Sequence, residues 1–122
     1  MEFNWESYVS LSERILSWCE KDLKEACLRT SISRAYYGVF CTARNKLIAE
    51  GVIIPKVSTH KFVREKYQAS KNKFKKKIGK NLKRLWAERK AADYEDKAEI
   101  SIQRAKIAIE IAKRTLKELK KI

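Results

Sequence analysis

The stretch LRTSISRAYYGVFCTARNKL, residues 28–47, carries the pattern that decides the fold. Its apolar side chains recur every three or four residues, at Leu28, Ile32, Ala35, Tyr36, Val39, Ala43 and Leu47. This period is typical of an amphipathic α-helix with a broad buried face. Gly51 is placed to end the helix. Gly38 lies inside it at a cost in helix stability, so we expect a neighbouring helix to cross closely there.

The segments on either side show the same helical period. A first helix is expected over about residues 4–25, with a break near Ala26 before the helix described above. A third helix should begin at Ser58 or Thr59, with one of these hydroxyls as its cap. A fourth helix, which carries a dense basic run, should follow a break at residues 70–72.

The last helix is expected to begin at Asp96, because the segment Asp96-Lys97-Ala98-Glu99 is a variant of the capping box. Its apolar positions alternate spacings of four and three residues, and three further isoleucines widen the stripe: Ala98, Ile102, Ala105, Ile109, Ala112, Leu116 and Leu119, with Ile100, Ile107 and Ile111. Such a face suits a central bundle helix or a seam shared with a second subunit. No strand pattern is present, so the sequence predicts an all-α, up-and-down bundle of four to five helices, one domain over residues 1–122.

The positive charge of this chain is concentrated in its middle third. The net charge of the chain is +14, and residues 51–90 contain 14 basic and only 2 acidic side chains. Eight basic residues and no acid lie between Lys71 and Arg84, which favours a phosphate-binding surface over a merely solvated face. The apolar stripe of this helix has no surplus for membrane insertion. The candidate RNA-binding residues here are Lys73, Lys75, Lys76, Lys77, Lys80, Lys83 and Arg84.

Two short strings on separate predicted helices hold the other candidate residues. Ser33-Arg34-Ala35-Tyr36-Tyr37 and Arg89-Lys90-Ala91-Ala92-Asp93-Tyr94 each place an arginine and a tyrosine on or near one helical face, and the only histidine, His60, lies between them. An arginine inside an apolar bundle needs an acceptor, either a carboxylate or a phosphate brought by a ligand. Arg34 and Tyr37 are therefore candidates for binding a phosphate and stacking a base.

Each of these residues also has a purely structural interpretation. Arg34 would pair with Asp93 or with an N-terminal glutamate, and Arg89 would pair with Asp93 one turn away on the same helix. Were Asp93 instead to bridge to Arg34, it would join two helices and orient Arg89 towards a ligand. His60 near a helix start is most simply a surface or capping residue, unless the fold places it near Arg89.

These strings, in this order, resemble the HEPN domain family, especially its small stand-alone prokaryotic members. The resemblance extends from Ile32 to Tyr94 and includes the Thr59-His60 helix start, a spaced Phe62 and the closing Arg-x-x-Ala-Asp-Tyr. It implies an all-helical, usually dimeric bundle that binds RNA or nucleotides. It also implies a role in toxin–antitoxin or antiviral defence, often beside a minimal nucleotidyltransferase. Many members are metal-independent endoribonucleases that use an arginine followed, after four to six residues, by a histidine.

In this chain the family's histidine is missing. Counting from Arg89, its place is taken by Tyr94, Glu95 or Asp96. A tyrosine with an ordinary pKa of about 10 is a poor general base for activating a ribose hydroxyl at neutral pH.

The sequence therefore favours an RNA- or nucleotide-binding, homodimeric protein of a toxin–antitoxin or defence module, with catalysis unassigned. The first alternative is a metal-independent endoribonuclease that uses Arg89, with His60 in place of the missing base and Tyr94 beside it. A second alternative is a protein-binding partner of a minimal nucleotidyltransferase.

The cysteines and the N-terminal residues bear on the cellular compartment. Cys19, Cys27 and Cys41 form no Cys-x-x-Cys pair, so we expect reduced, buried thiols rather than a zinc site completed by His60. No cofactor or metal is expected. The chain shows neither the pattern of a secretory signal nor an apolar run of about 20 residues, so we expect a cytoplasmic protein without a membrane span.

Overall fold

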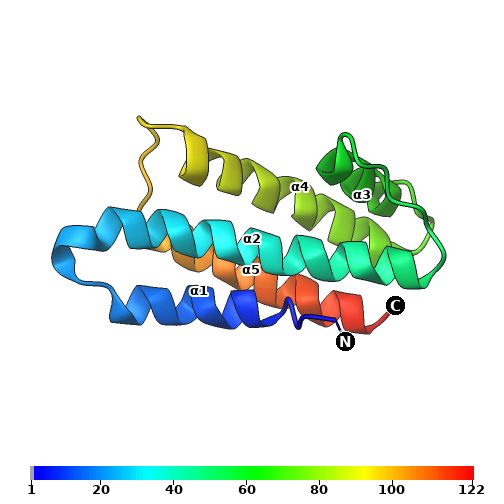
Figure 1. The fold of residues 1–122 in the computed structure, drawn as a ribbon, viewed down its shortest axis with the longest axis horizontal. Coiled ribbons are helices and arrows are strands. Elements are labelled where there is room, and N and C mark those ends of the chain that lie inside the picture. Colours follow the sequence, from blue (N-terminus) through cyan, green and yellow to red (C-terminus); the bar gives the residue numbers. More distant parts are fainter. Residues whose placement is uncertain (1) are drawn as a thin grey trace.

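The computed structural model describes residues 2–122, which form five α-helices and one short 3-10 helix (Figure 1). The elements are α1 (Ser7–Trp18), η1 (Lys21–Leu23), α2 (Lys24–Ala49), α3 (Thr59–Gln68), α4 (Lys73–Tyr94) and α5 (Ile102–Lys120). No strand occurs within this described part of the chain. The prediction of an all-α bundle is confirmed.

Helix α2 is the centre of the bundle and packs against α1, α4 and α5 (Figure 1). Successive long helices run up and down, and the shorter α3 lies against α4. The apolar stripe of α2 is buried as its sequence predicts, with Ile32, Ala35 and Val39 fully enclosed. The helix ends where expected: Gly51 has a φ of +89°, and the Val52 amide donates back to the Leu47 carbonyl at 3.0 Å.

Gly38 lies at the crossing of α1 and α2, as its place in the sequence predicts. A Cβ atom on Gly38 would lie 2.8 Å from Val9 Cγ2 and 3.1 Å from the Trp5 carbonyl oxygen. Only a glycine lets the two backbones approach this closely. A second close approach joins α3 to α4 at Gly79, where a Cβ would lie 2.6 Å from the Gln68 amide nitrogen.

The boundary between the first two helices is earlier than the sequence suggests. The prediction of one helix over residues 4–25 with a break near Ala26 is wrong, because α1 ends at Trp18 and the chain turns over Cys19–Leu23. Trp18 continues the apolar period but lies exposed, as does Leu23 in the turn, since the chain must reverse direction for α2 to pack against α1. Periodicity in the sequence does not register this reversal.

The turn also brings two cysteines together. Cys19 and Cys27 form a disulfide, so the expectation of reduced thiols is wrong for this pair. Their Cα atoms are 6.1 Å apart, within the usual span of such a bond. This proximity depends on where the chain reverses, and the spacing of the cysteines along the sequence does not reveal it. Cys41 is buried and unpaired, as expected.

Helix α3 begins at Thr59 as predicted, but neither hydroxyl caps it. Ser58 has a φ of 54°, in the left-handed region, and its side chain makes no capping hydrogen bond. The Thr59 hydroxyl donates instead to the Pro55 carbonyl at 2.9 Å. In contrast, α4 has a side-chain cap, since Asn72 Oδ1 accepts from the Phe74 amide at 2.8 Å.

The start of the last helix differs from the prediction by six residues. Helix α5 begins at Ile102, and Ser101 rather than Asp96 caps it, by accepting from the Arg104 amide at 3.0 Å. The Asp96 and Ala98 carbonyls, which a helix from Asp96 would need as acceptors, receive hydrogen bonds from Arg29 at 3.4 and 3.1 Å. A contact with α2 thus holds this segment out of the helix.

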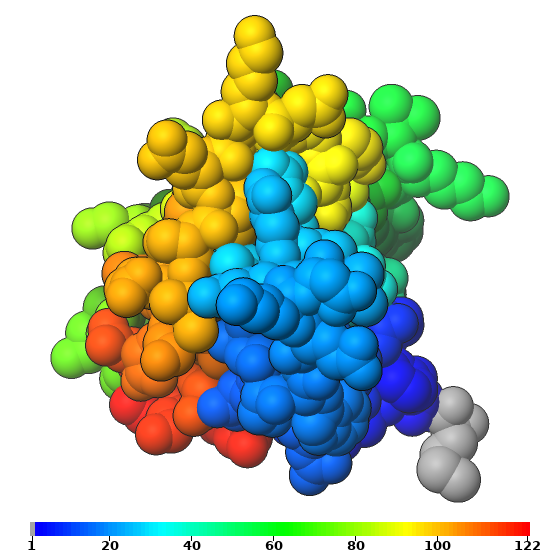
Figure 2. Space-filling model, turned by 90° about the vertical axis from the view of Figure 1, so that its left-hand side faces the viewer, coloured from blue at the N-terminus to red at the C-terminus, as the bar shows by residue number. Residues whose placement is uncertain are grey.

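Hydrogen bonds from Arg29 join the end of α4 to α2. The Arg29 guanidinium also donates to the Ala91, Ala92 and Glu95 carbonyls at 3.1–3.2 Å. Ala91 and Ala92 belong to the last turn of α4 and Glu95 is its C-cap residue. The Ala91 carbonyl also accepts from the Glu95 amide at 3.2 Å, so Arg29 adds to the backbone hydrogen bonds at this helix end. Figure 2 shows this end of the molecule, where the α1–α2 corner (blue) lies against the segment that joins α4 to α5 (yellow to orange).

The wide apolar face of α5 packs against other helices of the same chain. Most of its predicted positions are buried against the neighbouring helices, and among the widening isoleucines only Ile107 is exposed, at 52%. Of the two interpretations of this face, burial within the bundle is the one observed, although α2 rather than α5 is the central helix. The face is therefore not free to serve as a seam with a second subunit.

Candidate functional site

The two arginine-and-tyrosine strings meet where the last turns of α4 lie beside the middle of α2. Arg89 is largely buried, with 14% of its side chain exposed. Its Nε atom donates to Asp93 Oδ2 at 2.9 Å, and its Nη2 atom donates to the Tyr37 hydroxyl at 2.6 Å and the Tyr94 hydroxyl at 3.2 Å. Arg89 is thereby fixed between three oxygen acceptors from two helices.

Asp93 joins α4 to α2, but not by the ion pair with Arg34 that the sequence suggested as one possibility. Its Oδ2 atom accepts from the Ser33 hydroxyl at 3.0 Å as well as from Arg89. The Ser33 oxygen in turn accepts from Arg34 Nη2 at 3.2 Å. The structural interpretation, an ion pair one turn apart on α4, is therefore also observed.

Arg34 lies between two aromatic rings from different helices. Its guanidinium carbon is 5.1 Å from the centroid of the Tyr8 ring of α1 and 5.1 Å from that of Tyr37. No carboxylate lies within ion-pair distance of Arg34 among residues 2–122. The cation thus lies near two aromatic rings, while most of its N–H groups remain available to an acceptor.

Tyr37 brings the two arginines close together. The Arg89 guanidinium carbon also lies 5.1 Å from the Tyr37 centroid, so the two cations are at most about 10 Å apart. The ring of Tyr94, which is 67% exposed, has its centroid 5.1 Å from the Arg89 guanidinium carbon. The result is a ladder of alternating rings and cations, and the name arginine–tyrosine cleft stands below for this set of five side chains: Tyr8, Arg34, Tyr37, Arg89 and Tyr94.

His60 lies next to this cleft, in the first turn of α3. Its ring stacks on Phe40 with a centroid distance of 4.2 Å and meets the edge of Tyr37 at 5.9 Å. Its Nδ1 atom lies 2.5 Å from the Tyr36 hydroxyl. Burial lowers the pKa of His60, and the positive charges of Arg89 and Arg64 lower it further. His60 thus meets the condition of proximity to Arg89 under which the sequence gave it a functional role.

Most of the candidate basic residues of α4 face away from the cleft, whereas Lys75 leaves the helix on the same side as Arg89. Lys80 precedes Arg89 by nine residues, about two and a half helical turns, so the two side chains leave opposite sides of α4. Lys73, Lys76, Lys83 and Arg84 are exposed on the same outer side as Lys80. The basic surface and the arginine–tyrosine cleft are therefore separate features of one helix.

Two of the candidate lysines have acidic partners on other helices. Lys75 Nζ lies 2.9 Å from a Glu50 carboxylate oxygen, and Lys77 Nζ lies 3.8 Å from one of Glu118. The sequence shows no acid near these lysines because both partners come from distant segments. The unpaired part of the surface, which we name the outer basic face, consists of Lys73, Lys76, Lys80, Lys83 and Arg84.

Several residues of the site were not among the sequence candidates. Ser33 and Tyr36 stand within the string that contains Arg34 and Tyr37, so the signal for them was present in the sequence. Tyr8 and Arg29 have no such signal, because their roles arise only where α1 and α4 pack on α2. Arg64 contributes through its charge from one turn further along α3.

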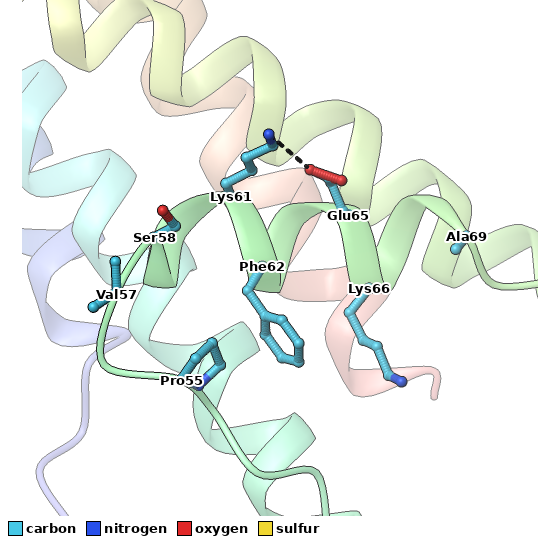
Figure 3. A pocket seen from close by; sticks show the side chains of 8 residues that line it. All are labelled: Pro55, Val57, Ser58, Lys61, Phe62, Glu65, Lys66 and Ala69. Atoms are coloured by element: carbon cyan, nitrogen blue, oxygen red, sulfur yellow. Dashed lines mark ion pairs between the residues drawn. The ribbon is translucent and has the colours of Figure 1, made fainter.

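An open cavity of about 410 Å³ lies on a different part of the surface, between the α2–α3 loop and α3 (Figure 3). Pro55, Val57 and Phe62 supply its apolar wall, and Lys61 forms a 3.8 Å ion pair with Glu65 at its rim. No residue of the arginine–tyrosine cleft lines it.

Two features are absent from residues 2–122. No three His, Cys, Asp or Glu side chains come together there to hold a metal ion. None of the described helices is long and apolar enough to cross a bilayer.

The fold and the cleft define a class: a small, strongly basic helical bundle in which two neighbouring arginines share one tyrosine. The family model described as HEPN domain matches residues 5–122. The chain belongs to the HEPN domain family, as the strings around Arg34 and Arg89 predicted. This membership supports a role related to nucleotides or RNA. Comparisons with curated proteins and with solved structures give no match.

Proposed function

We propose that the protein binds RNA or a nucleotide through the arginine–tyrosine cleft, with the outer basic face as a second contact for phosphates, and that it acts in a toxin–antitoxin or defence module. The observation that carries this proposal is the pairing of Arg34 and Arg89 around Tyr37. Asp93 neutralises Arg89, whereas Arg34 has no carboxylate within ion-pair distance in the described chain. The local excess of positive charge favours an anion.

The chemistry of the cleft suits a nucleotide more than a simple anion. A guanidinium that lies near aromatic rings still offers N–H groups in a planar fork, which matches the oxygens of a phosphate. The exposed Tyr94 ring offers a surface on which an unpaired base can stack. Phosphate and base would thus be held by neighbouring members of one ladder.

Substituting Arg34 tests this proposal. Arg34→Gln should weaken binding of a fluorescein-labelled single-stranded RNA by about 10- to 100-fold, the value of one charge-assisted hydrogen bond. Arg114→Gln is the matched control, since it removes the same charge from a largely exposed arginine of α5. Fluorescence anisotropy at fixed salt measures both affinities. Equal losses in the two variants would reduce the effect to net charge and contradict a specific role of the cleft.

The second candidate function is a metal-independent endoribonuclease, and the closeness of His60 to Arg89 favours it. Arg89 would stabilise the charged phosphorane, and His60 would take the proton from the ribose hydroxyl. Tyr94 would remain a weak base beside them.

A cleavage assay separates the two functions. We expect little or no cleavage of RNA by the isolated protein in the presence of a chelator. Robust cleavage that is lost in both His60→Ala and Arg89→Ala, with circular dichroism unchanged, would overturn this expectation and establish the endoribonuclease.

The proposed partners besides RNA are a second copy of the chain and a minimal nucleotidyltransferase. Both follow from family membership and not from a contact in the structure. Co-purification of the two proteins after co-expression tests the second partner.

A further inference from the structure

Tyr36 is the fully buried tyrosine of the string that runs from Ser33 to Tyr37. Its side chain is 1% exposed, and its hydroxyl has one hydrogen-bond partner among residues 2–122, His60 Nδ1 at 2.5 Å. The same two rings stack, with centroids 5.6 Å apart and planes at 22°. Tyr36 therefore controls both the orientation of the imidazole and the surroundings of one of its nitrogens.

The burial of Tyr36 decides which partner donates. Were His60 Nδ1–H to donate to the phenol oxygen, the phenolic proton would be enclosed without an acceptor, which is costly for a buried donor. With the phenol as donor and Nδ1 as acceptor, both groups are satisfied. Burial also raises the pKa of Tyr36, so the phenol keeps its proton.

We propose that Tyr36 fixes His60 in the tautomer that carries its proton on Nε2, so that the imidazole serves as a neutral hydrogen-bond donor to a phosphate oxygen rather than as a proton acceptor. An imidazole with a hydrogen-bonded Nδ1 and a proton on Nε2 has no free lone pair with which to take the proton of a ribose hydroxyl. The donor role rests on the proposed function, whereas the tautomer itself does not.

The other groups around His60 are consistent with a neutral ring. Arg64 of α3 and Arg89 of α4 both oppose a positive charge there, while Tyr37 and Phe40 of α2 present aromatic surfaces. A neutral N–H donor adds a hydrogen bond for a phosphate without adding a third repelling cation beside two arginines. In this arrangement His60 donates a hydrogen bond, whereas the alternative endoribonuclease requires a histidine that accepts the proton of the ribose hydroxyl.

The single histidine makes a direct test feasible. With selective ¹⁵N labelling of histidine, long-range ¹H–¹⁵N spectra show which ring nitrogen of His60 is protonated, without overlap from other residues. At a pH above 7 we expect Nε2 protonated and Nδ1 unprotonated. A proton on Nδ1 in the wild type would overturn the proposal.

Two phenylalanine substitutions show whether Tyr36 causes the preference. Tyr36→Phe should convert the single tautomer into a mixture. Tyr67→Phe is the matched control, because Tyr67 is equally buried but its hydroxyl donates to the Ala43 carbonyl at 2.7 Å and not to His60. An unchanged tautomer in Tyr36→Phe, or equal effects in both variants, would contradict the role of Tyr36.

Titration with inorganic phosphate tests the donor role separately. We expect the Nε2–H resonance to shift with added phosphate, and to shift less in Arg34→Gln. No shift would overturn the donor role of His60. The RNA affinity of Arg34→Gln reports on the proposed function independently, so the two failures are distinguishable.

Discussion

Arg29 shows how one side chain shapes the site from outside it. The guanidinium, 20% exposed, donates to five carbonyl groups in the last turn of α4 and the segment after it. These groups lie directly around Asp93 and Tyr94. The position of the arginine–tyrosine cleft therefore depends on a residue that belongs to the start of α2.

Replacing Arg29 by methionine should lower the free energy of unfolding by about 2–4 kcal/mol, because five carbonyl groups, three of them in part-buried contacts, lose a donor at once. Urea denaturation followed by circular dichroism measures the change. Arg114→Met, at an exposed position of α5, should cost less than about 0.5 kcal/mol. Similar losses in both variants would show that Arg29 contributes no more than a surface arginine.

His60 gives the free energy of unfolding a dependence on pH. Because its pKa is lower in the folded chain than its ordinary value, the unfolded chain binds the proton more readily. The contribution of His60 to the free energy of unfolding is complete above a pH of about 6.5 and declines as the pH falls below this value. His60→Gln should flatten the decline between neutral and mildly acidic pH in urea titrations. A slope that is identical in the variant would exclude His60 as its source.

At the scale of elements, α4 carries two candidate binding surfaces on opposite sides. Its inner side presents Arg89 to α2, and its outer side presents the outer basic face to solvent. The period of an α-helix permits this separation with a single run of sequence. The two surfaces can therefore be altered independently.

Reversing the charge of Lys76, Lys80 and Lys83 tests the outer basic face. The triple glutamate variant should bind single-stranded RNA more weakly and reduce the slope of log affinity against log salt by about 0.7 for each phosphate that the variant no longer binds. Lys75 and Lys77 are left unchanged because their ion pairs with Glu50 and Glu118 join helices. Anisotropy titrations over a range of salt provide the slope. An unchanged slope would mean that these lysines are only solvated.

At the scale of the whole molecule, the net charge of +14 acts on every association. Two copies of the chain repel each other, whereas RNA is attracted, and salt screens both effects. The wide face of α5 is used within the bundle, so a dimer has to form through another surface.

We expect a homodimer that buries more than about 1,000 Å² in total and becomes tighter as salt is raised. RNA binding should respond to salt in the opposite direction. Sedimentation velocity at low and high ionic strength, beside the anisotropy titrations, shows both trends. A monomer at micromolar concentration under both conditions would contradict the dimer.

The sequence by itself determined the all-α class, the buried stripe of residues 28–47 and the close crossing at Gly38, because an apolar period and a glycine act within one helix or on its nearest neighbour. It also marked Arg34, Tyr37, His60 and Arg89 as candidates, but not how they meet. The predictions for the end of α1, for the thiols of Cys19 and Cys27 and for the start of α5 were wrong.

Only the tertiary structure decided these features and the geometry of the cleft. Asp93 reaches Ser33 and Arg29 reaches the Ala98 carbonyl across helix contacts that join residues 60 and 69 positions apart in the chain. Such contacts depend on crossing geometry and on where the chain reverses. Local periodicity contains neither, because it fixes which face of a helix is buried but not which residues of another helix cover it.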